Sequence, residues 1–337
     1  MMSRRKQRGR EICGVIAVDK PAGMTSHDVV DRVRRVLRQR SVGHTGTLDP
    51  AATGLLMLCV GGATKFARYL SGMDKTYRAV VCFGRSTDSC DNDGETVAVY
   101  DGDLTQAVTE DKVKAALGKF SGEFSQMPPA FSAKKVKGQA AYKLARKGIE
   151  PELKSVAVRV DKITMSRCEP PDVEFELSCS AGFYIRALAR DLGLELGTGA
   201  YLKSLVRTHV GPFALDQAVG LDILTAADQG RVEKEYLLGL NEALKFMPAV
   251  SLADQAVEEL FFGRQVELES GVLGKGDGGA GGGLVTVRVL DSKGVFLGVG
   301  ELDSFRGAAD VLKPRRLMAG ASPARKDAGR DDLESTE

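Results

Sequence analysis

His44 and Asp49 are the residues of this sequence best placed to do chemistry, because they lie five positions apart in one short segment, residues 43–56. Three glycines and a proline shape the path of this segment, and apolar residues flank it. In such a loop Asp49 can be a carboxylate that is held next to a ligand. The alternative is a plain turn in which Asp49 caps a following helix. The spacing by itself leaves both interpretations open.

The elements that lead into this segment are predicted from their apolar patterns. Residues 15–18 form a short apolar run typical of a buried strand, which ends in the loop 19–24. A helix follows, capped by Thr25 or Ser26, with valines at helical spacing on one face and arginines on the other. This helix should end before Gly43, so it leads directly into the candidate segment.

Further strands and helices follow the candidate segment. Residues 53–60 and the alternating stretch 77–83 predict two strands. A turn is expected at 91–94 and a proline-rich, basic loop at 127–138. The other predicted elements are helices over 109–120, 139–146 and 184–196, and strands over 156–165 and 173–179. Strands in runs with helices between them fit the α+β class better than a strictly alternating α/β fold.

The composition changes near residues 245–253, where we place a boundary between a domain of residues 12–245 and a small β-rich domain of residues 250–318. Strands of the second domain are expected over 265–268, 284–290 and 295–302. The glycine-rich stretch 274–283 is expected to be a flexible insertion at a hairpin tip. Disorder is expected at both ends, as a basic arm over 1–11 and a charged tail over 319–337.

Composition also restricts the class of protein. With 337 residues, 43% of them hydrophobic, the chain can bury a sizeable core and is expected to be soluble and cytoplasmic. The apolar stretch 12–18 is too short to span a membrane, so no membrane association is expected. The six cysteines show no CxxC pair and no histidine-rich spacing, so neither a metal site nor a disulfide framework is indicated.

The net charge of +2 hides local basic clusters. Basic residues gather at 1–10, 134–137 and 313–316, and acids in the tail offset them in the total. One such run is usually a solvated surface, but several in one chain indicate a polyanionic partner.

Residues 43–56, with the sequence GHTGTLDPAATGLL, resemble the signature of the TruB family, the bacterial tRNA pseudouridine-55 synthases. Further segments similar to family motifs follow in family order, at 18–26, 75–78, 127–133 and 182–193. The likeness is strong over residues 12–215 and looser at 298–301 and 313–316, which are similar to the family's PUA-like RNA-binding ending. It implies a pseudouridine synthase catalytic domain with a mixed, mainly antiparallel sheet, followed by a PUA-like domain.

The resemblance implies an isomerase that converts uridine 55 in the T-loop of tRNA to pseudouridine, by detaching the base at N1 and rejoining it through C5. Asp49 matches the family's catalytic aspartate, the nucleophile. Arg186 matches an arginine that keeps this carboxylate ionised and oriented. Tyr77 matches a tyrosine that lies against the uracil and is the candidate for removing the C5 proton.

The same resemblance implies residues that bind the target nucleotide, which is stacked inside the T-loop and has to be flipped out. His44 matches a histidine that occupies the emptied space, while Tyr184 and Leu205 match the residues that wall the base. Lys20 is expected to contact a phosphate. No metal, organic cofactor or guide RNA is implied, and the protein is expected to act as a monomer on the T-stem-loop of tRNA.

Three positions depart from the family pattern. Phe131 stands in place of a tyrosine, Phe183 in place of a small residue such as threonine, and Tyr201 in place of a histidine. These changes affect substrate contacts and leave the expected reaction class alone. Two alternative functions remain, a tRNA-binding folding chaperone whose catalysis is secondary and a guide-dependent relative that works inside a ribonucleoprotein.

Overall fold

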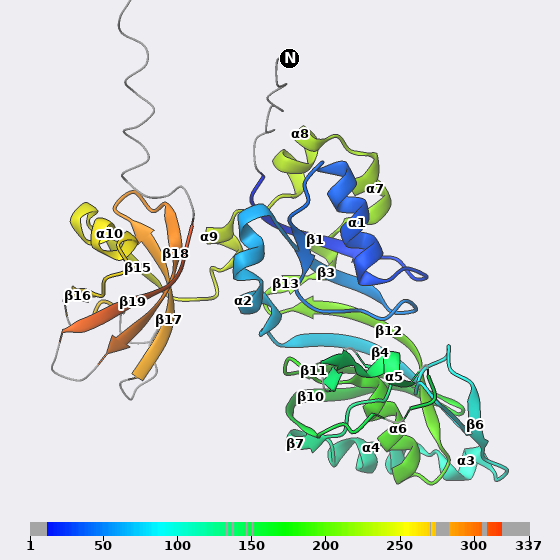
Figure 1. Ribbon diagram of the computed structural model, residues 1–337. Coiled ribbons are helices and arrows are strands. Elements are labelled where there is room, and N and C mark those ends of the chain that lie inside the picture. The colour runs from blue at the N-terminus through cyan, green and yellow to red at the C-terminus, as the bar shows by residue number, and fades with distance from the viewer. Residues whose placement is uncertain are drawn as a thin grey trace, which may run out of the picture.

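The computed structural model of the protein describes residues 12–132, 134–136, 138–145, 147–149, 151–269, 271–273, 283–304 and 309–318. The predicted basic arm, the glycine-rich insertion up to residue 282 and the predicted tail lie outside the described residues. The described part of the chain forms a large sheet with helices on both faces and a smaller β-rich domain beside it (Figure 1).

The large sheet has ten strands in the described part of the chain, in the order β14-β1-β3-β12-β4-β11-β10-β7, with β2 beside β3 and β13 beside β12. Its strands are β1 (Gly14–Lys20), β2 (Val42–His44), β3 (Thr53–Val60), β4 (Lys75–Phe83), β7 (Gly122–Gln126), β10 (Val156–Glu169), β11 (Asp172–Cys179), β12 (Ala200–Val210), β13 (Phe213–Ala214) and β14 (Val219–Gly220). Only the pairs β1–β14 and β3–β12 are parallel among these described strands. The predicted mixed and mainly antiparallel sheet is therefore confirmed.

The two faces of this sheet carry separate hydrophobic cores, because successive strand residues point to opposite sides. Val18 and Leu56 are paired across β1 and β3 and lie in the first core, together with residues of α1 (Ser26–Val36), α4 (Glu110–Gly118), α6 (Ile185–Glu195) and α7 (Leu221–Ala226). Val15 and Met57 lie in the second core, with η1 (Gly61–Phe66), α2 (Ala67–Ser71) and α9 (Leu240–Ala243). The candidate site lies on the side of the first core.

The helix before the candidate segment forms as predicted. Thr25 caps α1, and Thr25 and Asp28 form a reciprocal capping box that satisfies backbone N–H groups at the first turn. Val29, Val30 and Val33 of α1 are buried, in agreement with the predicted apolar face. The predicted helices over 109–120 and 184–196 are likewise confirmed by α4 and α6.

The remaining elements of the first domain are short. They are β5 (Arg85–Thr87), β6 (Thr96–Val99), α3 (Leu104–Ala107), β8 (Lys135–Val136), β9 (Gln139–Ala140), α5 (Ala141–Ala145), η2 (Leu215–Gln217), α8 (Gln229–Arg231) and η3 (Val232–Tyr236). The helix predicted over 139–146 begins only at Ala141, because residues 139 and 140 pair with β8 in a small hairpin.

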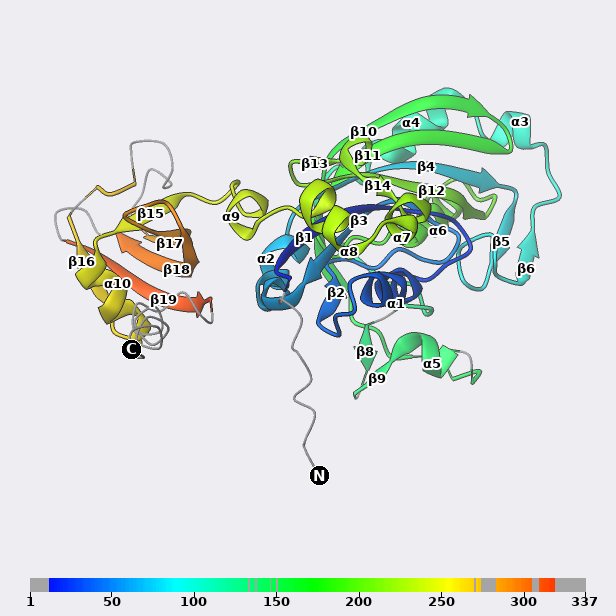
Figure 2. The same ribbon diagram turned by 90° about the horizontal axis from the view of Figure 1, so that it is seen from above.

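The C-terminal domain is a five-stranded sheet in the order β15-β17-β18-β19-β16, with one helix against it. Its elements are β15 (Ala249–Leu252), α10 (Asp254–Phe261), β16 (Val266–Leu268), β17 (Gly283–Asp291), β18 (Phe296–Ser304) and β19 (Asp310–Leu317). The three predicted strands are confirmed, and the strand pattern in the sequence did not predict α10. Figure 2 shows this domain next to α2 and α9.

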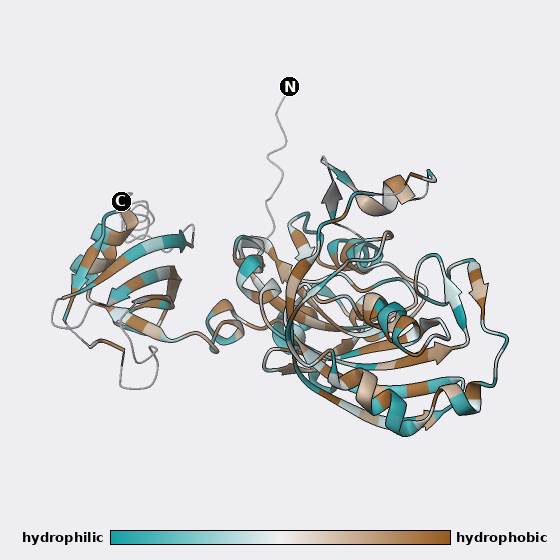
Figure 3. Ribbon diagram, turned by 90° about the horizontal axis from the view of Figure 1, so that it is seen from below, coloured by the Kyte–Doolittle hydropathy of each residue, from teal (hydrophilic) through white to brown (hydrophobic). Residues whose placement is uncertain are grey.

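The two domains share apolar contacts. Val299 of β18 is buried in the second core, and the Phe296 ring meets the Phe66 ring of η1 edge to face, with 5.5 Å between centroids. Figure 3 shows hydrophobic and hydrophilic residues alternating along the strands of both domains. The relative position of the domains is thus set by packed side chains as well as by the connecting chain.

Candidate active site

Asp49 and Arg186 form a bidentate ion pair at the centre of the site. Asp49 lies in the loop between β2 and β3, and Arg186 lies in the first turn of α6. Arg186 Nε is 3.0 Å from Asp49 Oδ2, and Nη2 donates to Oδ1 at 3.3 Å. The arginine side chain is 10% exposed and the aspartate side chain 41% exposed. The structure therefore brings these two predicted residues together with the carboxylate open to a ligand.

The loop that carries Asp49 is fixed to the start of α1. Ser26 Oγ donates to the Leu48 carbonyl at 3.0 Å and accepts from the Leu48 N–H at 2.8 Å. The Gly23 N–H donates to the Pro50 carbonyl at 2.9 Å. Strand β3 follows the loop, so the alternative prediction that Asp49 caps a following helix is wrong. The segment does contain a turn, in which the Ala52 N–H donates to the Asp49 carbonyl at 3.1 Å.

Lys20 donates hydrogen bonds to the loop that carries Asp49. It does not make the predicted contact position available to a phosphate. Its side chain is fully buried, and Nζ donates to the carbonyls of Pro21 at 2.8 Å, Pro50 at 3.2 Å and Ala52 at 2.6 Å. An ammonium group has three hydrogens, so no donor remains for a phosphate. Burial lowers the Lys20 pKa to about 8, against the nearby Asp49 charge, which raises it.

Arg186 also binds groups that the sequence patterns did not single out. Its Nη1 donates to the Ser89 carbonyl at 3.1 Å and lies 3.2 Å from Asp91 Oδ2, while Nη2 donates to the Phe131 carbonyl at 2.8 Å. Asp91 belongs to the predicted turn 91–94, where an aspartate is ordinary, so nothing in the sequence marked it. Phe131 contributes its backbone, which a phenylalanine supplies as well as a tyrosine.

The environment of Asp49 raises the pKa of its carboxyl group above the ordinary aspartate value. Burial is the main cause, and the Asp91 carboxylate adds to it. The Arg186 guanidinium acts in the opposite direction and favours the ionised form. One cation is thus placed between two carboxylates, of which Asp49 is the more open to solvent.

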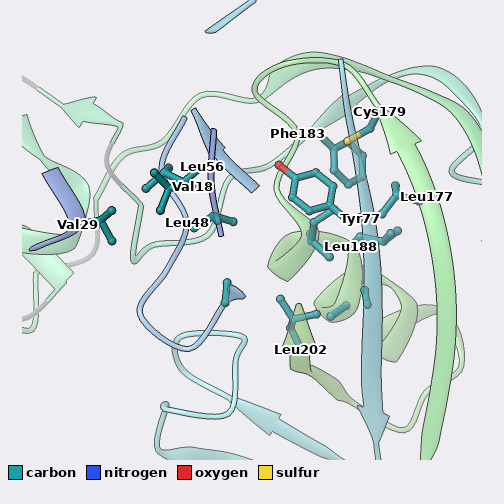
Figure 4. Packing of buried hydrophobic residues seen from close by; sticks show 14 of the residues in the cluster. Val18, Val29, Leu48, Leu56, Tyr77, Leu177, Cys179, Phe183, Leu188 and Leu202 are labelled. Carbon is teal, nitrogen blue, oxygen red and sulfur yellow. The ribbon is translucent and has the colours of Figure 1, made fainter. Parts of the chain in front are cut away.

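Tyr77 lies in β4 against the apolar residues of the first core. Figure 4 shows its ring among Phe183, Leu188 and Cys179, with the hydroxyl at the edge of the cluster. Burial raises the Tyr77 pKa, and the charge and hydrogen bonding of Arg207 oppose that rise. The Asp49 carboxylate also raises this pKa, so the aspartate and the tyrosine share one electrostatic environment.

The other three predicted residues lie in β2, directly before α6 and in β12. His44, in β2, has a buried Nδ1 that meets no hydrogen-bond partner among the described residues, and burial lowers its pKa, which favours the neutral ring. Tyr184 precedes α6, where Gln126 exchanges hydrogen bonds with its backbone N–H at 2.9 Å and carbonyl at 3.1 Å. Leu205 of β12 packs against the first core. The sequence patterns missed Gln126, as a single polar residue at a strand end.

Neither a metal site nor a membrane span is indicated by the described part of the chain. None of its groups of histidine, cysteine, aspartate and glutamate could hold a metal ion. The helices among the described residues are too short or too polar to cross a bilayer. No disulfide joins the cysteines within the described ranges.

Comparison with known proteins agrees with the motif placement. Residues 34–185 match the N-terminal domain model of TruB family pseudouridylate synthases, residues 186–245 match the tRNA pseudouridylate synthase B C-terminal domain, and residues 248–318 match the C-terminal model of pseudouridine synthase II TruB. The fold is shared with a solved H/ACA ribonucleoprotein bound to a substrate RNA containing 2′-deoxyuridine, at a TM-score of 0.66 and 24% identity over 91% of this chain and 85% of that one.

Two named relatives extend over nearly the whole chain. A tRNA pseudouridine synthase B from Aquifex aeolicus is 39% identical over 307 residues, which are 90% of this chain and 99% of the relative. A second, from Saccharophagus degradans, is 38% identical over 325 residues, 94% of this chain and 99% of the relative. With the domain matches and the Asp49–Arg186 pair in place, the chain belongs to the TruB family of pseudouridylate synthases.

Proposed function

We propose that this protein isomerises uridine 55 in the T-loop of tRNA to pseudouridine, without a guide RNA. The observation that carries the proposal is the Asp49 carboxylate, which is held through both oxygens by Arg186 and remains open on one side. Relatives named tRNA pseudouridine synthase B support the substrate class, because they match this chain along nearly their full length.

In the proposed reaction Asp49 is the nucleophile. Its carboxylate adds to the nucleotide, the N1–C1′ bond breaks, the uracil turns, and a new bond joins C5 to C1′ as the carboxylate leaves. Arg186 keeps Asp49 ionised and fixes the direction of its oxygens, which lowers the cost of reaching the reactive geometry. Tyr77 then accepts the proton that C5 loses.

The target base has to leave the RNA stack before it reaches Asp49, at a cost of a few kcal/mol. We place the flipped uracil against the Tyr77 ring, with Tyr184 and Leu205 as walls of the pocket. His44 lies at the edge of the same loop, where its neutral ring can occupy the space that the base leaves. Lys20 serves this pocket indirectly, as the support of the Asp49 loop.

The C-terminal domain is proposed to bind the tRNA outside the T-loop. In its basic run 313–316, Lys313 pairs with Asp303 at 3.1 Å and Arg315 pairs with Glu301 at 2.5 Å. Arg316 is exposed and makes no ion pair within the described ranges, so it is the cation of this run best placed to contact a phosphate.

The test is conversion of a bare T-stem-loop transcript by the purified protein, compared with the Asp49→Asn variant. The wild type should form pseudouridine in the absence of any other RNA, and the variant should bind the transcript with similar affinity and form none. A wild-type protein that acts only in the presence of a guide RNA would instead support the guide-dependent alternative. Full activity of Asp49→Asn would overturn the assignment of the nucleophile.

A further inference from the structure

Arg207 of β12 is a buried cation that the reaction described above does not use. It is 2% exposed, and in the described part of the chain it forms no ion pair with a carboxylate. Its Nε donates to the Leu55 carbonyl at 2.7 Å and its Nη2 to the Gly46 carbonyl at 3.1 Å. Burying a charge without a counter-charge costs free energy, so a position of this kind calls for a compensating interaction.

The sheet register places Arg207 directly beside Tyr77. The two residues are paired across the antiparallel strands β12 and β4, so their side chains project from the same face of the sheet. Hydrogen bonds to Leu55 and Gly46 fix the guanidinium from two sides, and Gly46 leaves room for it, since a Cβ there would be 3.4 Å from Nη1. The Arg207 guanidinium is therefore held in place beside Tyr77, whose hydroxyl proton can be gained and lost.

The groups around Tyr77 show how Arg207 affects the pKa of this tyrosine. Burial raises the Tyr77 pKa, and the Cys179 thiol and the Asp49 carboxylate raise it further, so the surroundings resist formation of a phenolate. Among the described residues, Arg207 is the main group that lowers the Tyr77 pKa, by charge and by hydrogen bonding. Lys75, another buried cation close to Arg207, donates to the carbonyls of Ser71 and Met73.

We propose that Arg207 is a positioning residue for Tyr77, which it orients toward C5 and stabilises as the phenolate that accepts the C5 proton. In this step the phenolate oxygen forms an O–H bond as the C5–H bond breaks. The electron pair of the broken bond forms the C5=C6 double bond, the π electrons of the N1=C6 bond move onto N1, and N1 takes a proton from water. The hydroxide left by this water removes the proton from Tyr77 and restores the phenolate. The inference rests on the proposed role of Tyr77, and it adds the group that makes this role possible in a buried site.

The test uses a T-stem-loop whose target uridine carries either hydrogen or deuterium at C5. Single-turnover rates are measured for the wild type, Arg207→Lys, Arg207→Gln and Tyr77→Phe. Arg207→Lys should be roughly 10-fold slower and Arg207→Gln roughly 100-fold slower, since loss of assistance to one proton transfer has effects of this size. Both should show a larger deuterium isotope effect than the wild type, because C5 deprotonation becomes the slow step.

The matched control is Arg288→Lys. Arg288 is another partly buried arginine that donates to backbone carbonyls, those of Met247 at 3.0 Å and Asn241 at 3.1 Å, but it lies in the C-terminal domain. Its replacement should leave the isotope effect unchanged.

The outcomes separate the inference from the proposed function. Slower Arg207 variants with the wild-type isotope effect would overturn the inference, since a purely structural role slows all steps alike. If Arg207→Gln does not fold, the isotope effect of Arg207→Lys decides, because lysine retains the charge. A Tyr77→Phe variant with the wild-type rate would instead remove Tyr77 from the proposed reaction.

Discussion

Arg186 and Asp49 are separated by 137 positions in the sequence, yet two guanidinium nitrogens of the one meet both carboxylate oxygens of the other. The same guanidinium contacts Asp91 and two backbone carbonyls. Since all three guanidinium nitrogens of Arg186 have partners, the orientation of this side chain is set by the protein before any substrate binds. The ion pair is thus part of a network, and changes at either end of this network should affect the carboxylate.

The acid limb of the pH–rate profile should move in opposite directions in two variants. Arg186 lowers the Asp49 pKa, so Arg186→Gln should raise it and move the limb to higher pH. Asp91 raises the same pKa, so Asp91→Asn should move the limb to lower pH. Both variants should also lose about 10-fold or more in maximal rate, because the carboxylate is less well oriented. Single-turnover rates on a T-stem-loop between pH 4 and pH 8, with exposed Asp101→Asn as the control, provide the measurement.

Gly54→Ala should destabilise the protein on the order of 3 kcal/mol. Gly54 is paired with Lys20 on one side and Arg207 on the other, and has a φ of +99°. A Cβ at this position would lie 2.4 Å from the Arg207 carbonyl oxygen. Chemical denaturation measures the loss of stability. Gly43→Ala is the matched control in the adjacent strand, since a Cβ there meets nothing within 4 Å, and equal losses in the two variants would contradict the prediction.

Lys20→Met should cost about 2 kcal/mol near pH 7, because backbone carbonyls under the Asp49 loop lose their donor. The sign of the pH dependence follows from a folded-state pKa of about 8 against 10.5 for the unfolded chain. Between these values the unfolded state binds more protons, so the stability of the wild type rises with pH relative to the variant. The gap in the free energy of unfolding should therefore widen from pH 8 to pH 10. A constant gap would show that Lys20 has an ordinary pKa in the fold.

Phe66→Ala should destabilise the contact between the domains by about 3 kcal/mol. Phe66 is fully buried and packs edge to face on Phe296. The free energy of unfolding and the affinity for full-length tRNA should both fall, while the affinity for an isolated T-stem-loop changes less. Phe262→Ala, at a side chain 76% exposed, is the control. Equal losses of affinity for the two RNAs would mean that the domain contact does not serve tRNA binding.

Much of the fold was predictable because its signals are local. The alternation of residues 77–83 predicts β4, and the threonine before an apolar helical pattern predicts the start of α1. The likeness of the segment 43–56 and the motif around Arg186 to one family brought Asp49 and Arg186 together before the structure did. Such a likeness carries information on long-range pairing that no local pattern contains.

The residues that escaped prediction depend on contacts across the chain. Lys20 is a surface lysine on any local criterion, and only the packing of β1 against β3 buries it beneath the loop. Arg207 is one of two Lys or Arg residues in β12, with Lys203, and its place beside Tyr77 depends on the register of β12 with β4. In the sequence Asp91 is an ordinary turn aspartate, and its ion pair with Arg186 of α6 is formed only in the folded chain. Side-chain burial and strand register depend on long-range contacts, and local patterns in a single sequence do not predict them.

The anchoring of the Asp49 loop has a calorimetric consequence. Before any RNA is bound, the loop is hydrogen-bonded to Ser26 of α1, to Gly23 between β1 and α1, and to Lys20 of β1. Little of this loop is left to become ordered on association, so its own contribution to the heat-capacity change of binding should be small beside that of the RNA, as bases unstack and apolar surface is buried against the pocket. A T-loop that is already open should then bind with a smaller heat-capacity change and a more favourable entropy than an intact one.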